Sequence, residues 1–224
     1  MVTKFLNIKT IFMGTINNGI LGGFSGTTGP VIGGSWNGIQ YMRSRPGPRT
    51  KPPTRAMQVQ QAKFALATRF LRSMPALIKL GFTNTNGKIM SGYNSALSYT
   101  LQRAIWGEYP NLEIDYRKAL VARGTLPNAG SVSVAVEGEQ VRFNWLSNEA
   151  FSHAEATDQA IVVAYHAPSN KAYYTIGTAK RGDQSAILGL PTLKGEEVET
   201  WLAFISAAGD EVASSIYTGR VKIE

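Results

Sequence analysis

SVSVAVEGEQVRFNW, residues 131–145, alternates apolar and polar side chains on both sides of its central EGE. This period of two is typical of antiparallel strands that bury one face, and EGE is a turn signal between two such strands. Five apolar side chains are expected on the buried face: Val132, Val134, Val141, Phe143 and Trp145. The stretch therefore predicts two neighbouring strands of an antiparallel sheet.

The period of two extends from Leu112 to the end of the sequence, with turn signals such as PNAG, APSNK and AAGDE between apolar runs. The predicted strands are Glu113–Val121, Ser131–Val136, Gln140–Trp145, Ala160–His166, Lys171–Thr178, Ser185–Leu190, Val198–Ser206 and Ser214–Ile223. Short strands at this spacing predict a sandwich of the immunoglobulin or fibronectin type III kind. Further core candidates are Trp201, Phe204 and Tyr217. Because cysteine is absent, the inter-sheet disulfide of antibody domains is excluded.

Residues 14–50 are glycine-rich, and the segment GGSWNGIQYM within them predicts a β-hairpin. Asn37-Gly38 is a favoured pair for a two-residue turn, because both positions need a positive φ. A lone two-stranded hairpin is only marginally stable in water. Its apolar arms must therefore pack on another element or another molecule, and the candidate assembly residues are Trp36, Ile39 and Tyr41.

Residues 43–55 contain four prolines and five basic residues, which predicts an extended, partly polyproline-like connector. A helix is expected to follow Thr54 as N-cap, because apolar residues then recur at three- and four-residue spacing. Pro75 should kink or restart this helix, and Gly81 can end it. A second helix is predicted over Lys88–Trp106, so the two form a helical hairpin.

These patterns together predict an α+β protein, in which a glycine-rich hairpin and two helices precede the all-β sandwich. The expected regions are 14–111 and 112–224, and the sandwich is expected to fold without the first region. Residues 1–13 are expected to be an N-terminal extension, with Met13 as an alternative start. Polar residues interrupt the apolar stretch there, so no signal peptide is predicted. No stretch approaches the ~20 apolar residues of a membrane span, so a soluble protein of undetermined compartment is expected.

Charge is distributed unevenly along the chain. Residues 1–107 hold thirteen Lys and Arg and no acid, whereas residues 108–224 hold ten bases and fifteen acids, and the net charge of +8 conceals this contrast. Such asymmetry indicates either a polyanionic partner for the first half or attraction between the halves. The candidate polyanion-binding residues of the connector are Arg43, Arg45, Arg49, Lys51 and Arg55.

No catalytic pattern stands out in the sequence. The absence of cysteine excludes thiolate nucleophiles, zinc–thiolate sites and iron–sulfur clusters, and the common hydrolase, nucleotide-binding, metalloprotease and calcium-loop motifs are missing. His153 and Asp158 lie close together in sequence and could form an acid–base pair, but solvated loop charges are the preferred interpretation. Arg181–Asp183 spells the RGD tripeptide in a predicted turn, where no role is expected. We therefore expect a non-enzyme with no catalytic residues, cofactor or metal site.

Several segments resemble a known family. MGTINNGILGGFSG from Met13, the following GGSWNGIQYMRSRP and the helical QQAKFALATRFL are similar to an uncharacterised bacterial family, the "domain of unknown function 6266" family. YPNLEIDYRKALVARG and WLAFISAAGDEVASSIYTGRV extend the resemblance to nearly the whole chain. Thr27-Thr28 departs from it, since a basic residue is expected after the glycine. The resemblance implies a two-part layout that begins at Met13, and it implies no activity because the family has none assigned.

Two functional hypotheses remain. The first is a structural or interaction protein, in which the N-terminal hairpin and helices mediate assembly with a protein partner or a second copy and the sandwich presents a binding surface. The alternative is a nucleic-acid-binding protein that uses the basic connector and the first helix. Salt-independent oligomers would favour the first hypothesis, and nucleic acid that is removed by salt would favour the alternative.

Overall fold

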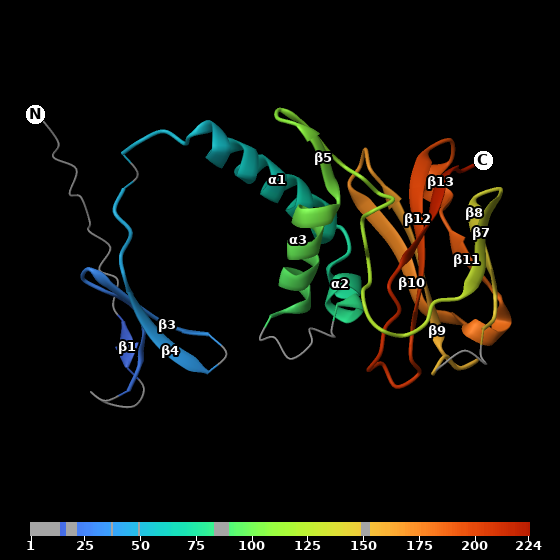
Figure 1. Cartoon of the computed structure of the whole chain (residues 1–224), viewed down its shortest axis with the longest axis horizontal. Coiled ribbons are helices and arrows are strands. Elements are labelled where there is room, and N and C mark those ends of the chain that lie inside the picture. The colour runs from blue at the N-terminus through green and yellow to red at the C-terminus, as the bar shows by residue number, and fades with distance from the viewer. Residues whose placement is uncertain (1–13, 17–21, 37, 49, 83–89, 149–152) are drawn as a thin grey trace, which may run out of the picture. The chain divides into compact units, whose positions relative to one another are not determined.

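The computed structural model describes residues 14–16, 22–36, 38–48, 50–82, 90–148 and 153–224 (Figure 1). The predicted extension 1–13 and the candidate residue Arg49 lie outside the described residues. The chain forms two compact units, residues 1–52 and residues 53–224. It is an α+β protein in which antiparallel strands dominate.

The first unit contains a four-stranded antiparallel sheet in the order β1-β2-β3-β4. Its strands are β1 (Thr15–Ile16), β2 (Phe24–Thr28), β3 (Val31–Trp36) and β4 (Ile39–Ser44). In the β3–β4 pair Trp36 lies opposite Ile39 and Val31 lies opposite Ser44. Gly38 between the two strands has a φ of +80°, which favours glycine because a Cβ is strained in this region.

The second unit begins with three helices, α1 (Arg55–Arg72), α2 (Pro75–Gly81) and α3 (Gly92–Arg103). The side chain of Thr54 accepts a hydrogen bond from the Met57 amide and caps α1, as the sequence predicted. Pro75 opens α2, because its missing N–H has no partner to lose at a helix start. Among the described residues no helix is long and apolar enough to cross a membrane.

The predicted second helix was too long. Ser91 caps α3, and the helix ends before Ala104, while Lys88 lies outside the described residues. Ile105 and Trp106, predicted as helical, belong instead to β5 (Ile105–Glu108), which pairs with β6 (Asn111–Ile114). The antiparallel β5–β6 pairing reverses the direction of the chain, and after β6 the Asp115 amide donates a hydrogen bond to the carbonyl of Ala104.

Seven further strands form two antiparallel sheets. The strands are β7 (Gly130–Glu137), β8 (Gln140–Leu146), β9 (Gln159–His166), β10 (Lys171–Lys180), β11 (Ser185–Gly189), β12 (Glu197–Ile205) and β13 (Ile216–Lys222), with short 3₁₀ turns η2 (Arg181–Asp183) and η3 (Pro191–Leu193). The sheet orders are β11-β8-β7 and β10-β9-β12-β13. Their facing sides share one core, in which Phe143 and Trp145 of β8 meet Leu202 and Phe204 of β12.

The first predicted strand, Glu113–Val121, was wrong beyond its first two residues. The strand β6 ends at Ile114, and the amides of Lys118 and Ala119 then donate to the carbonyl of Asp115. This turn breaks the extended conformation. Ala119 and Val121, which follow the turn, are buried, and this burial accounts for the apolar residues there. Trp201 Nε1 donates a hydrogen bond to the Ala119 carbonyl at 3.1 Å.

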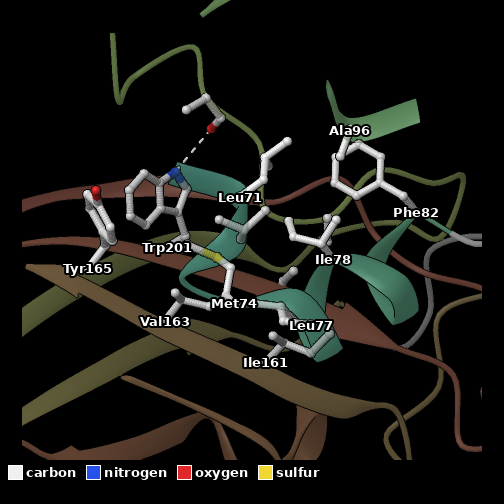
Figure 2. Close-up of a cluster of buried hydrophobic side chains, with 14 of the residues drawn as sticks. Leu71, Met74, Leu77, Ile78, Phe82, Ala96, Ile161, Val163, Tyr165 and Trp201 are labelled. Atoms are coloured by element: carbon white, nitrogen blue, oxygen red, sulfur yellow. Dashed lines mark hydrogen bonds between the residues drawn. The ribbon is translucent and has the colours of Figure 1, made fainter. Parts of the chain in front are cut away.

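The helices cover one face of the sheet β10-β9-β12-β13, and the sheet β11-β8-β7 packs on its other face (Figure 1). The face that the helices cover is the outer face of this sheet. Successive side chains of a strand point to opposite faces. In β12, Leu202 and Phe204 therefore face the other sheet, while Trp201 faces the helices. Figure 2 shows Met74 and Leu77 of the helical layer against Val163 and Ile161 of β9. Trp201, expected in the core between the sheets, thus fills the helix–sheet core instead.

The division into compact units differs from the predicted boundary at residues 111 and 112. It falls between Pro52 and Pro53, so the helices belong to the same unit as strands β7 to β13. The physical reason is the shared core, because Phe70, Met74 and Ile78 are fully buried together with side chains of β9 and β12.

Candidate functional site

The histidine and aspartate considered for acid–base chemistry have separate partners. His153 Nε2 lies 3.0 Å from Glu211 Oε2, and both side chains are largely exposed. Asp158, expected to be a solvated loop charge, is instead buried, and its Oδ2 accepts from Arg181 Nε at 2.9 Å. The same oxygen accepts from the Glu155 amide.

Arg181, the first residue of the RGD tripeptide, is completely buried. Its guanidinium donates to Asp158, to Asn148 Oδ1 at 2.8 Å and to the Pro127 carbonyl at 2.8 Å. It also lies 4.2 Å from the centre of the Phe204 ring. These contacts join the loop after β8 to the turn after β10, so Arg181 is engaged inside the protein and is not presented at the surface.

The candidate assembly residues lie on the N-terminal sheet and are exposed. The exposed fractions are 53% for Trp36, 58% for Ile39 and 46% for Tyr41. Met42 on β4 and Ile16 on β1 are exposed as well, and all six residues of β4 are exposed. Trp36, Ile39 and Tyr41 share one face of the sheet, because Trp36 lies opposite Ile39 and side chains two residues apart in a strand point the same way, whereas Ile16 and Met42 lie on the other face.

The described basic residues of the connector are also exposed, namely Arg43, Arg45, Lys51 and Arg55. Arg43, Arg45 and Lys51 belong to the unit 1–52, whose sequence contains no acidic residue.

A pocket in the second unit was not predicted from the sequence. It has a volume of about 910 Å³ and lies between α1, the β5–β6 pair and one end of the outer sheet face. Leu66, Arg69 and Phe70 line it from α1, at the spacing of one helix face. Trp106 lines it from β5, and residues 112–117 line it from β6 and the turn that follows.

A polar row on three neighbouring strands forms part of the pocket lining. Tyr165 of β9 lies opposite Glu199 of β12, and Glu199 lies opposite Arg220 of β13. The buried Glu199 carboxylate accepts from Arg220 Nε at 2.8 Å and from the Tyr217 hydroxyl at 2.5 Å. Both carboxylate oxygens are thereby satisfied, as a buried charge requires.

Aromatic rings surround this row. Phe70 makes edge contacts with Tyr116 and Tyr165, at centroid distances of 6.2 and 5.1 Å, and Trp201 lies 5.6 Å from Tyr217. Burial raises the pKa of Tyr116, Tyr165 and Tyr217 above the usual tyrosine value. The Glu199 carboxylate raises the pKa of Tyr217 further, because the hydroxyl donates a hydrogen bond to it. These hydroxyls therefore remain neutral at physiological pH.

The sequence carried one overlooked signal for this arrangement. AIVVAY (residues 160–165) and WLAFI (residues 201–205) are continuous apolar runs instead of alternating ones. Such runs are typical of strands that are buried on both faces. They indicated a layer on the outer face of the sheet, although not which segment forms it.

Comparisons with known proteins agree with the resemblance seen in the sequence. No curated protein matches the chain. Residues 23–219 match the Family of unknown function (DUF6266), and this range includes the buried Arg181 network, β2 to β4 and the pocket lining except Arg220. The chain belongs to this family of unknown function.

Proposed function

We propose that this is a non-enzymatic interaction protein, which self-associates through its N-terminal sheet and presents a binding surface on its sandwich. The observation that carries the proposal is a set of three large apolar side chains exposed on one face of the N-terminal sheet, namely Trp36, Ile39 and Tyr41. Contiguous exposed apolar side chains on a soluble protein typically mark an interaction site. Each large side chain that becomes buried contributes about 1.5–3 kcal/mol.

The edge of this sheet supports the same proposal. β4 is the outermost strand in the order β1-β2-β3-β4, and all of its residues are exposed. An exposed strand edge presents unpaired backbone groups, which pair readily with a strand of another chain. A second copy of the chain brings an identical edge, so strand pairing and apolar burial can act together.

The order of the sandwich strands supports a fibronectin type III-like assignment. Of the seven strands β7 to β13, the fourth strand β10 lies beside the third strand β9. In constant-type immunoglobulin domains the fourth strand lies beside the fifth instead. The fibronectin type III arrangement has the fourth strand beside the third. Sandwiches of this architecture are common in cell-surface domains, in agreement with a binding role.

The non-enzymatic part of the proposal rests on how the charged groups are used. Asp158 is engaged by the buried Arg181, and His153 is paired with Glu211. Acid–base catalysis needs a titratable group within reach of a substrate proton. Two groups held apart by separate ion pairs do not provide a catalytic pair.

Light scattering after size-exclusion chromatography, at low and high salt, tests the assembly. The wild-type chain should form oligomers at both salt concentrations, because apolar burial is not screened. Trp36→Ser or Ile39→Ser should dissociate them. Ile187→Ser is the matched control, since Ile187 is 43% exposed but lies on β11 of the other unit. A monomeric wild-type chain, or equal dissociation by the control, contradicts the proposal.

Polyanion binding is the second candidate, because Arg43, Arg45, Lys51 and Arg55 are exposed and the unit 1–52 contains basic residues but no acid. About five phosphate contacts, with Arg49 included, give a log–log salt slope near −4.5 by counterion release. Changing Arg43, Arg45 and Lys51 to Ser should flatten the slope by about 2.7. Duplex binding that is absent, or independent of salt, excludes this candidate.

A further inference from the structure

The pocket between α1, the β5–β6 pair and the outer sheet face has the size of a small-molecule site. Its volume of about 910 Å³ falls in the usual range of several hundred Å³ to about 1,000 Å³. All of its lining residues belong to the unit 53–224. Its lining contains both aromatic side chains and charged groups, so it suits a ligand with both a flat apolar face and a polar group.

The acidic groups of the pocket are largely engaged within the protein. Both oxygens of Glu199 accept hydrogen bonds, one from Tyr217 and the other from Arg220. Asp115 Oδ2 lies 3.1 Å from Lys118 Nζ. The hydroxyl of Tyr165 donates to Asn170 Oδ1. At Asp115 and Glu199 a cationic ligand would therefore have to displace existing partners, which leaves Glu113 as the one exposed carboxylate of the lining.

The basic groups, in contrast, are available. Arg69 on α1 and Arg117 after β6 are exposed, and neither guanidinium forms an ion pair with any carboxylate of the described residues. The lining contains one exposed carboxylate, that of Glu113, beside these two exposed guanidinium groups. The pocket thus offers more free donors than free acceptors. Guanidinium groups bind carboxylates by paired hydrogen bonds in a fixed geometry.

Trp106 supplies a stacking face at the pocket. It is 59% exposed although it is one of the largest apolar side chains in the protein, and it lies on β5 opposite Glu113 of the paired strand β6. The half-buried ring of Tyr116 lines the same pocket. Flat rings of this kind stack with the apolar faces of ligand rings and retain a polar edge.

We propose that this pocket binds a small carboxylate whose acid group is attached to a ring with a flat apolar face. Arg69 and Arg117 hold the carboxylate, and Trp106 stacks on the ring. A uronic acid sugar and an aromatic carboxylic acid share this chemistry. The inference deepens the binding role of the sandwich unit in the proposed function, and it does not depend on assembly through the N-terminal sheet.

Isothermal titration calorimetry on the full chain tests the ligand chemistry with two matched pairs. Glucuronate is compared with neutral glucose, and phenylacetate with neutral phenylacetamide. Binding of glucuronate alone identifies the sugar source, binding of phenylacetate alone identifies the aromatic source, and binding of both leaves the shared chemistry as the specificity. In each case the neutral counterpart should bind at least tenfold more weakly. The proposal is overturned if neither acid binds, or if the neutral compound binds as well as its acid.

Variants then locate the site. Arg69→Gln and Arg117→Gln should each weaken binding by roughly tenfold to a hundredfold, the loss of one charge-assisted hydrogen-bonded pair. Arg72→Gln is the matched control, because Arg72 is an exposed arginine of the same helix that does not line the pocket. Unchanged thermal melting by circular dichroism shows that each variant is folded. Equal affinity of the Arg69→Gln, Arg117→Gln and wild-type proteins overturns the assignment.

The assembly state is measured on the same samples by light scattering. Ligand binding with a monomeric chain would refute the assembly but not the pocket. Oligomers without ligand binding would refute the pocket but not the assembly. The two proposals therefore fail separately.

Discussion

Asp158 and Arg181 form an ion pair in which the side chains are 3% and 0% exposed. The pair joins the residue before β9 to the 3₁₀ turn after β10, and Arg181 also donates to Asn148 and to the Pro127 carbonyl. A buried pair costs desolvation of both charges, so its net stabilisation is modest. Removal of one partner destabilises the protein strongly, because the other charge then remains buried without compensation.

We therefore predict that Asp158→Ala lowers the free energy of unfolding by about 3–5 kcal/mol, the usual effect of breaking a buried pair. His153→Ala should change it by no more than about 0.5 kcal/mol, since exposed positions contribute little. Urea unfolding followed by circular dichroism measures both values. Similar stabilities of the two variants would show that the buried pair does not hold this region together. The expectation from sequence, that both residues are solvated loop charges, was wrong for Asp158, which is buried.

The elements themselves were largely predictable, because their signals are local. Thr54 caps α1 and Pro75 opens α2, each through its own hydrogen-bonding chemistry. Strands β7 to β13 lie close to the positions that turn residues and apolar runs predicted. The end of the predicted second helix and the predicted strand over residues 113–121 were wrong, because the β5–β6 pairing and the turn at Asp115 depend on contacts with other elements.

The helical layer gives a prediction at the scale of elements. Met74 is fully buried between α1 and α2 and packs in the helix–sheet core (Figure 2), whereas Met57 on α1 is 40% exposed. Met74→Ala should lower the free energy of unfolding by about 2–5 kcal/mol, because it leaves a cavity. Met57→Ala should change it by no more than about 0.5 kcal/mol. Equal effects in urea unfolding would mean that the helices do not pack on the sheet in solution.

At the scale of the whole molecule, the shared core argues against an independent sandwich. Trp201, Val163 and Ile161 are fully buried under the helices, so a chain that begins at residue 112 would expose them. The unit that starts at Pro53 keeps this core intact.

Residues 53–224 should therefore unfold in one cooperative thermal transition. Residues 112–224 should melt at a clearly lower temperature or aggregate, because large apolar patches on a monomer promote association. Circular dichroism melts and light scattering on the two fragments measure the difference. Equal melting temperatures would restore the boundary that the sequence suggested at residue 112.

The sequence by itself determined what depends on neighbours along the chain: the α+β class, most strands, the start of α1, the interruption at Pro75 and the family. Charge and the missing motifs limited the functional hypotheses without choosing between them. Only the tertiary structure decided that the helices cover β9 and β12, that Asp158 is buried against Arg181, and that Arg69, Trp106 and Arg117 line one pocket. The physical reason is that hydrophobic periodicity shows which face of an element is buried, but not which distant segment covers it.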